Sequence, residues 1–228
     1  MKRSFVTALV CTGLFLTVFS SPSSAAKPGS EIDQLQINVT VQRDHTESIQ
    51  HSFENDDVKG WVTVKRGNTA VADAVVKIGD KTLTYDAVFM KQYAAKFATS
   101  DYKPGSALTV SVTIGGRVFT GTVTLPGGIT ISGDGTSVTW AHEGNRDWLS
   151  VSPADNPGAP AYDTYQGIGT TESPDLKSPH KIPSSTYTPT GKIFMLHVVV
   201  STWQNAFSES GASGNITAND IFSVEFQK

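Results

Sequence analysis

The sequence predicts an all-β protein built from antiparallel β-sandwich domains in tandem. The first observation is the alternation of apolar and polar residues, as in Leu35–Val41, Leu108–Ile114 and Phe222–Phe226. Each such row places its apolar side chains on one face of a sheet and leaves the other face to solvent. The second observation is the short turn signals between rows, such as Gly79-Asp80 and Gly115-Gly116. Such residues tolerate the positive φ of tight turns, and short strands joined by them are typical of sandwiches and barrels.

Residues 1–26 are expected to be a secretory signal peptide. A basic start, Lys2-Arg3, precedes the apolar run Phe5–Phe19 and a small-residue stretch that ends at Ala26. This order is typical of a cleaved signal, and the run is shorter than the roughly 20 residues of a spanning helix. Because the single Cys11 lies in this run, the mature chain would contain no cysteine. We therefore expect a secreted, periplasmic or cell-surface protein.

A break at Leu125-Pro126-Gly127-Gly128 divides the rest of the chain. Proline has no N–H to donate and the glycines are flexible, so strand pairing should stop there. The charge balance changes at the same point, from 11 basic and 11 acidic residues before it to 5 and 10 after it. The predicted division is an N-terminal strand and polar linker over 27–59, a first sandwich over 60–127 that includes a strand at 32–41, and a second sandwich over 128–228. A single barrel of nine to twelve strands is the alternative.

Residues 86–98 are compatible with two kinds of secondary structure. The spacing of Phe89, Tyr93 and Phe97 matches one face of a helix, with Asp86 as its N-cap. Read as a strand, Tyr93 and Phe97 would also share one face. Periodicity does not decide between the two in so short a run.

The second half resembles a fibronectin type III or related immunoglobulin-like module. Ser137–Trp140 is similar to the strand that carries the core tryptophan of such modules, and Phe194–Val200 is similar to their long penultimate strand. The first half, with Val62–Val64 and Ala74–Asp80, resembles a bacterial immunoglobulin-like domain. The resemblance implies two immunoglobulin-like domains and a binding, adhesive or spacer role outside the cytoplasm. The Pro-rich segment 153–191 is longer than an ordinary loop of these modules.

The apolar rows also predict the residues of the two cores. For the first domain these are Trp61, Val62, Val64, Val76, Ile78, Leu108, Val110, Val112 and Ile114. For the second domain they are Ile129, Ile131, Val138, Trp140, Leu196, Val198 and Phe222.

The sequence contains none of the motifs that mark common enzyme active sites. The G-x-S-x-G, H-E-x-x-H, P-loop and EF-hand spacings are absent. No cluster of Lys and Arg indicates nucleic-acid binding, and no apolar run after residue 26 is long enough to span a membrane. We therefore assign no catalytic residue, no cofactor, no nucleic-acid partner and no membrane span in the mature chain.

A polar stretch from Arg43 to Lys59 allows two interpretations. Its histidines and acids are His45, His51, Asp44, Glu54, Asp56 and Asp57. Imidazole and carboxylate are ordinary metal ligands, so a metal site is one interpretation. The stretch is rich in charge and lacks apolar periodicity, which favours a solvated linker. We therefore predict a linker and assign no metal site.

A ligand site is predicted at the Pro-rich segment 153–191 and the strand before it. This segment contains Tyr162, Tyr165 and Tyr187, and Trp148 precedes it by five residues. Aromatic side chains outside the apolar alternation are candidates for ligand contact. The alternative is that the tyrosines hold the long loop against its own sandwich.

These observations predict an exported, non-enzymatic binding, adhesion or surface-associated module with a protein or glycan partner. One alternative is a carbohydrate-binding or carbohydrate-active protein, for which aromatic planes that stack on sugar rings would decide. Another is a structural assembly subunit that uses strand addition, with residues 32–41 as the added strand.

Overall fold

The computed structural model describes residues 35–164, 176–208 and 211–228. The expected signal peptide and Tyr165 lie outside these residues. The all-β prediction is confirmed, because strands make up 61% of the chain and helix 4%. The short 3-10 helices η2 (Thr99–Asp101) and η3 (Ser184–Tyr187) lie between strands. No helix in the described ranges is long and apolar enough to cross a membrane.

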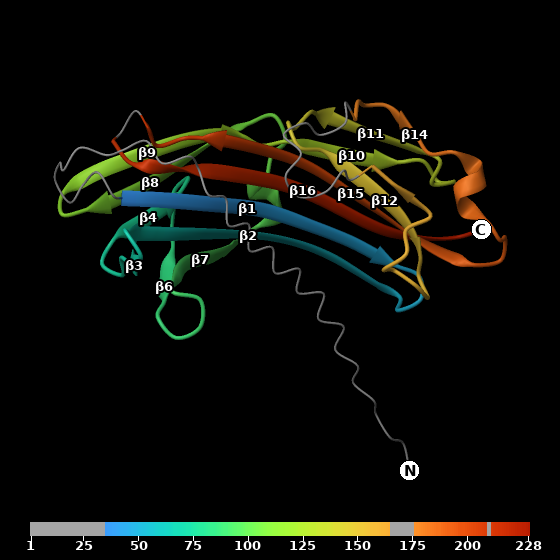
Figure 1. The fold of residues 1–228 in the computed structure, drawn as a ribbon, viewed down its shortest axis with the longest axis horizontal. Helices are drawn as coiled ribbons and strands as arrows, with labels where there is room; N and C mark the ends of the chain where they lie inside the picture. The colour runs from blue at the N-terminus through green and yellow to red at the C-terminus, as the bar shows by residue number, and fades with distance from the viewer. Residues whose placement is uncertain (1–34, 165–175, 209–210) are drawn as a thin grey trace, which may run out of the picture. The chain divides into compact units, whose positions relative to one another are not determined.

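Within the described ranges, the strands form one large sheet and two small ones (Figure 1). The large, nine-stranded sheet has the order β13-β12-β15-β16-β1-β2-β7-β6, with β3 paired to β2. Its strands are β1 (Leu35–Ser48), β2 (Phe53–Arg66), β3 (Thr69–Ala70), β6 (Thr84–Asp86), β7 (Gln92–Phe97), β12 (Trp148–Pro153), β13 (Tyr162–Asp163), β15 (Ile193–Asn205) and β16 (Ser213–Gln227). The four-stranded sheet contains β5 (Lys81–Thr82), β4 (Val75–Ile78), β8 (Ala107–Ile114) and β9 (Arg117–Thr124). The three-stranded sheet contains β10 (Gly127–Ile131), β11 (Ser137–His142) and β14 (His180–Lys181).

The central pair of the large sheet departs from the purely antiparallel pattern that the sequence predicted. β1 and β16 run parallel, from the pair Gln36–Ser213 to the pair Glu47–Val224. β2 and β15 flank them in antiparallel register (Figure 1). Alternation shows which side chains share a face, but it carries no information on the direction of the neighbouring strand.

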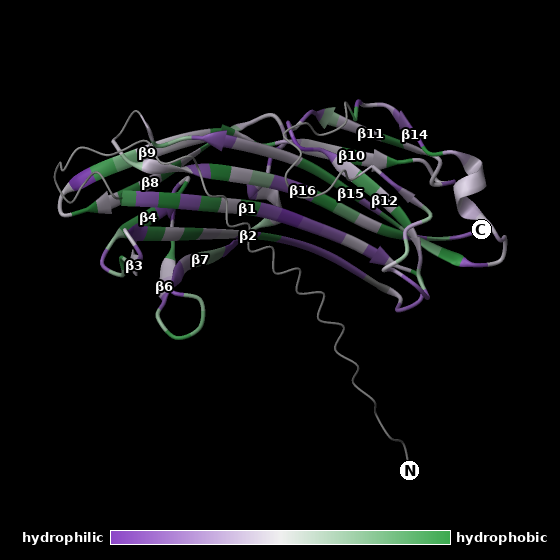
Figure 2. Cartoon of the chain, in the orientation of Figure 1, coloured by the Kyte–Doolittle hydropathy of each residue, from purple (hydrophilic) through white to green (hydrophobic). Residues whose placement is uncertain are grey.

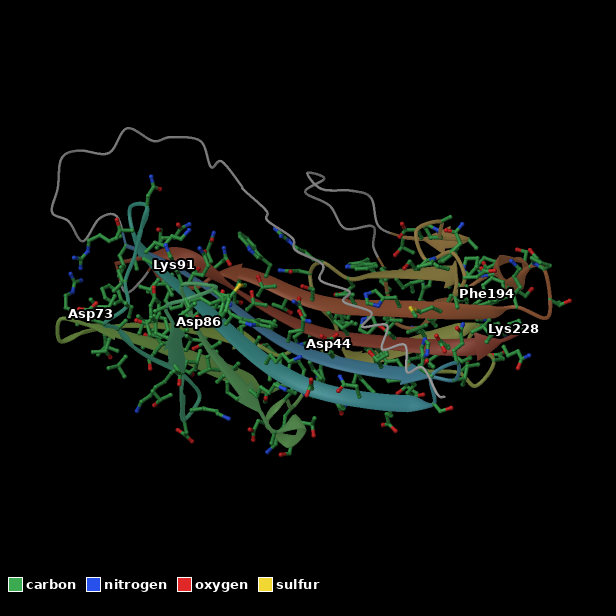
Figure 3. The ribbon with its side chains drawn as sticks, turned by 90° about the horizontal axis from the view of Figure 1, so that it is seen from below. Asp44, Asp73, Asp86, Lys91, Phe194 and Lys228 are labelled. Atoms are coloured by element: carbon green, nitrogen blue, oxygen red, sulfur yellow. The ribbon has the colours of Figure 1, made fainter. Side chains whose placement is uncertain are left out.

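Two hydrophobic cores lie against the same face of the large sheet. Alternate residues of β1 and β16 point into these cores, and Figure 2 shows the alternation as hydrophobic and hydrophilic bands along both strands. The first core packs the large sheet against the four-stranded sheet, through residues such as Val39, Val110 and Ile216. The second packs it against β11 of the three-stranded sheet, through residues such as Trp140 and Leu196. In Figure 3, Phe194 of the second core and Asp73 of the first half lie toward opposite ends of the protein.

Most of the predicted core residues are buried, and Trp61 is the informative exception. It lies between Gly60 and Val62, and Val62 is fully buried in the first core. Because successive side chains of a strand point to opposite faces, Trp61 points away from that core. The prediction of Trp61 as a core residue was therefore wrong.

The segment 86–98 is a turn followed by a strand, β7. Asp86 does not cap a helix: its carboxylate accepts hydrogen bonds from the N–H groups of Val88 and Phe89, at 2.9 and 3.0 Å, in a local turn. Tyr93 is buried in the first core, whereas the side chain of Phe89 is 86% exposed. Burial of one face of β7 therefore decides the ambiguity in favour of the strand.

The polar stretch 43–59 is a hairpin and not a linker. Residues 43–48 continue β1, residues 53–59 begin β2, and they pair in register from Arg43–Val58 to Ser48–Phe53. Most side chains at the outer end of this hairpin are polar. The sequence therefore shows no apolar alternation here that would predict a strand. Pairing with β16 on the other side of β1 extends the strand beyond its apolar part.

The predicted division at Pro126–Gly128 stays a prediction. Most residues of the first core precede this point and those of the second core follow it. Phe207, Ile216 and Ala218 of the second half nevertheless belong to the first core, and residues Glu31–Lys228 group into one compact unit. β1 of the first half also pairs with β16 of the second half along almost its whole length. β16 thus contributes to both cores, with Ile216 and Ala218 in the first and Val224 in the second.

Separate expression of residues 27–126 and 128–228 tests this division. Each fragment would expose a long unpaired strand edge, so we expect each to unfold at a lower urea concentration than the intact chain. Circular dichroism during urea unfolding measures this. Two fragments that unfold cooperatively with the midpoint of the intact chain would instead support independent domains.

Candidate functional site

The face of the large sheet that points away from both cores is here called the open face. In the central strands, the side chains of this face alternate with those of the cores, so the register of the sheet determines which of them are neighbours. Of the described residues, neither core contains an open-face side chain of β1, β2, β15 or β16. The central part of the open face consists of Asn38, Thr40, Gln42, Lys59, Trp61, Thr63, Ser201, Trp203, Asn205, Asn215, Thr217 and Asn219.

Two tryptophans and two threonines form one row across the open face. Thr40 of β1 pairs with Trp61 of β2 on one side and with Thr217 of β16 on the other. Thr217 in turn pairs with Trp203 of β15. All four side chains are partly exposed. Since neighbouring strands are about 4.8 Å apart, the two tryptophans are separated by about 14 Å across the sheet.

Amide and hydroxyl side chains line both sides of this tryptophan row. The row on one side is Thr63, Asn38, Asn215 and Asn205, and the row on the other side is Lys59, Gln42, Asn219 and Ser201. Within these rows the Asn215 amide donates a hydrogen bond to the Asn38 oxygen at 3.1 Å. The Ser201 hydroxyl donates to the Asn219 oxygen at 2.7 Å. Ser201 is buried, but the partly exposed amides of Asn38, Asn215 and Asn219 retain further hydrogen-bonding capacity, because an amide offers two donors and two acceptor lone pairs.

A turn before β12 places a cation over Trp203. The carboxylate of Asp147 is buried and accepts hydrogen bonds from the N–H groups of Gly144 and Ser201, at 3.1 and 2.9 Å. Its burial raises its pKa to about 6. The neighbouring Arg146 lies with its guanidinium carbon 4.5 Å from the centre of the Trp203 ring. The turn therefore adds an exposed hydrogen-bond donor to one end of the tryptophan row.

The open face combines aromatic planes with neutral hydrogen-bonding groups. Aromatic rings present apolar surface, and amide and hydroxyl groups both donate and accept hydrogen bonds. A sugar ring has the matching surface, with apolar C–H faces and a rim of hydroxyl groups. The chemical groups of the tryptophan row and its two flanking rows are therefore complementary to those of neutral sugars.

The structure does not bring the predicted site residues onto one surface. Trp148 lies on the open face, where its ring centre is 5.0 Å from that of His197. Tyr162 pairs with Val151 and packs at the margin of the second core, and its hydroxyl is 2.9 Å from Nε2 of His180. The two aromatic side chains thus lie on opposite faces of the sheet.

Tyr187 is a member of the second core. Its side chain is 4% exposed, its hydroxyl donates to the carbonyl of Gly135, and its ring meets Phe194 edge-on at 5.4 Å. Burial raises the pKa of its hydroxyl to about 12. These contacts fit the alternative in which the tyrosine holds the Pro-rich segment against its own sheet.

The sequence reasoning missed Trp203 and placed Trp61 in the core. The signal for Trp61 was its position directly beside Val62, since both cannot face the same core in a strand. The same rule applies to Trp203. Alternate residues of β15 before it are buried in the second core, and Trp203 falls on the other face. Only the register of the four paired strands shows that the two tryptophans lie in one row.

His197 and Ser223 form a pair that resembles part of a nucleophilic site. Nδ1 of His197 lies 2.7 Å from the Ser223 hydroxyl, and the Asp44 carboxylate interacts electrostatically with the histidine, whose burial lowers its pKa. Ser223 is buried on β16, a central strand that pairs with β15 on one side and with β1 on the other. The backbone N–H groups around Ser223 take part in the hydrogen-bond ladders with the neighbouring strands. This part of β16 therefore offers no free, preorganised N–H donors for an oxyanion. The geometry therefore supports a structural hydrogen bond.

Some of the acids of the β1–β2 hairpin, together with His45, form two groups on the core side of the sheet, whereas Asp44 and Asp57 point to the open face. Arg43 donates two hydrogen bonds to Asp56, at 2.9 and 2.8 Å. His45 meets Glu54 and also Glu47, which the sequence analysis did not single out. The signal for Glu47 was its i, i+2 spacing from His45 on one strand.

No protein-family model matches this chain, and no curated protein matches it significantly in sequence.

Proposed function

We propose that this chain is an exported binding module whose open face binds a neutral polysaccharide. The observation that carries the proposal is the row Trp61–Thr40–Thr217–Trp203, which extends across four paired strands. Two tryptophans on strands about 14 Å apart suit an extended chain of sugars better than a single small molecule. The flanking amides and hydroxyls suit the hydroxyl groups of such a chain.

The composition of the open face supports a glycan over a protein partner. Protein interfaces are centred on a closely packed apolar patch. The two rows beside the tryptophans instead contain amides, hydroxyls and one lysine, with no aliphatic side chain. The basic start and apolar run of residues 1–26 support export, which would place the module where polysaccharides occur.

Binding to a panel of immobilised oligosaccharides and polysaccharides tests the proposal. We expect the wild-type protein to bind at least one neutral glycan. Trp61→Ala and Trp203→Ala should each weaken that binding about tenfold, since a stacked ring contributes about 1.4 kcal/mol, and the double variant should weaken it about a hundredfold. Melting temperatures should change little, because both rings lie outside the cores.

Phe89→Ala is the matched control, because it removes an aromatic ring that is 86% exposed in the turn before β7 and is not part of the tryptophan row. It should leave glycan binding unchanged. Trp148→Ala in the same assay tests whether the aromatic residue predicted from sequence extends the site. A wild-type protein that binds no glycan, or a double variant that binds as well as the wild type, would contradict the proposal.

The assembly alternative has less support. It uses residues 32–41 as a strand added to another molecule, but residues 35–41 already pair with β2 and, from residue 36, with β16 of the same chain. A strand that is paired on both sides has no free edge to offer.

A further inference from the structure

A cluster of three potential metal ligands lies at the outer end of the β1–β2 hairpin. His45 and Glu47 are two residues apart on β1, and Glu54 is directly opposite Glu47 on β2. All three side chains therefore lie on the same face, which is the core side of the sheet and the opposite of the open face. The cluster lies beyond the first core and is independent of the tryptophan row.

The ligand atoms of the three residues converge. Nε2 of His45 lies 3.4 Å from an oxygen of Glu47 and 3.4 Å from an oxygen of Glu54. One ligand atom from each residue lies within 4.8 Å of the other two. A tetrahedral zinc ion with bonds of about 2.0–2.1 Å holds its ligand atoms about 3.3 Å apart. The two distances from the imidazole are thus close to those of a coordination site.

The imidazole nitrogen itself is unsatisfied. Nε2 of His45 is buried and has no hydrogen-bond partner, although the two carboxylates lie beside it. The ring meets Phe222 edge-on, with centres 4.3 Å apart, and its side chain is only 16% exposed. Phe222 therefore restricts the ring while the nitrogen points toward the carboxylates. A buried polar atom without a partner is rare in proteins and requires a physical explanation.

The charges around the cluster also favour a cation. Glu47 and Glu54 form a direct cross-strand pair of like charges, which destabilises a sheet unless it is compensated. The guanidinium of the neighbouring Arg43 is already bound by both oxygens of Asp56. Asp220 is a further acidic group whose electrostatic interaction reaches His45. This end of the hairpin is therefore acidic.

We propose that His45, Glu47 and Glu54 bind one divalent transition-metal ion of the Zn²⁺ class. One imidazole nitrogen and two carboxylate oxygens are a donor set that zinc accepts, whereas Ca²⁺ and Mg²⁺ prefer oxygen ligands alone. Glu54 is 71% exposed, so an ion can reach the site from solvent, and a water molecule can complete the coordination. The ion joins β1 to β2 and neutralises the repulsion between the two glutamates.

Isothermal titration of the metal-free, untagged full chain with Zn²⁺ tests the proposal. We expect one ion per chain and a rise in melting temperature on saturation, because the ion binds only the folded hairpin. The variant Glu47→Gln with Glu54→Gln preserves the side-chain shapes and removes two anionic ligands. It should bind zinc at least about tenfold more weakly and lose the rise in melting temperature.

The matched control is Asp44→Asn with Asp57→Asn. These residues also form a direct cross-strand pair on β1 and β2 but point to the open face, so the control removes the same charge from the same hairpin. It should bind zinc as the wild type does. Equal affinity in both double variants, or a wild type that binds no zinc or binds Ca²⁺ equally well, would overturn the proposal.

The single variant Glu54→Gln distinguishes a lost ligand from a misfolded hairpin. Its side chain is largely exposed, so the fold should survive, as circular dichroism can verify. With Co²⁺ as the probe, the wild type should show the visible absorption of a four-coordinate ion, and Glu54→Gln should show a weaker or shifted band. Identical spectra would count against Glu54 as a ligand and against the proposal.

Discussion

Replacing Gly214 with alanine is expected to destabilise the protein by about 3 kcal/mol or more. Gly214 has a φ of +136°, and it pairs with Ile37 where β1 and β16 begin their parallel ladder. A Cβ at this position would overlap the backbone carbonyl of Ile37. Because the obstacle is backbone rather than a flexible side chain, one of the two central strands must move, and the ladder that serves both cores would be disturbed.

Gly191→Ala is the control for the backbone angle alone. Gly191 has a φ of +86°, and an added Cβ would meet no atom within 4 Å. It should therefore cost about 1 kcal/mol, the penalty for the conformation itself. Urea unfolding of both variants measures the difference. Similar losses in the two variants would show that the close approach of β16 to β1 is not important for stability.

Tyr187→Ala should lower the free energy of unfolding by about 3–5 kcal/mol, as for other large buried aromatic residues. The ring is buried in the second core against Phe194, and its hydroxyl donates to the Gly135 carbonyl. Removal leaves a cavity and an unpaired carbonyl. Tyr187→Phe retains the ring and should cost only about 1 kcal/mol for the lost hydrogen bond.

Thermal and urea unfolding of both Tyr187 variants, together with the glycan assay, distinguish packing from ligand contact. Packing predicts a large loss of stability for the alanine variant and unchanged glycan binding for Tyr187→Phe. If Tyr187→Ala is as stable as the wild type but does not bind, the tyrosine is a binding residue, as the sequence had suggested.

The two faces of the large sheet have separate roles in this view. Burial on the core side supplies the stability, with Ile37, Val39 and Val62 fully or almost fully buried. The polar side chains between them on the same strands contribute little to either core. Substitutions on the open face can therefore alter binding without unfolding the protein, which is why Trp61 and Trp203 are suitable residues for the test.

Much of the strand content was predictable from local pattern. The alternation in Leu35–Val41 and in Leu108–Ile114 identified strands and their buried faces, because side-chain direction in a strand repeats every two residues. The same rule, applied strictly, would have placed Trp61 opposite Val62. Turn residues such as Gly115-Gly116 likewise marked a real connection, since they occupy the positive φ that the turn between β8 and β9 requires.

Tertiary structure alone decided which strands are neighbours and in which register. The parallel pairing of β1 with β16 joins residues that are about 180 positions apart, and nothing in either strand specifies that partner. The row of Trp61 and Trp203 depends on this pairing, as does the placement of Phe222 against His45. Alternation is a local property of the backbone, whereas register is selected by the packing of whole sheets. For this reason the sequence by itself determined that these strands have a buried and an exposed face, and only the fold determined what the exposed face presents.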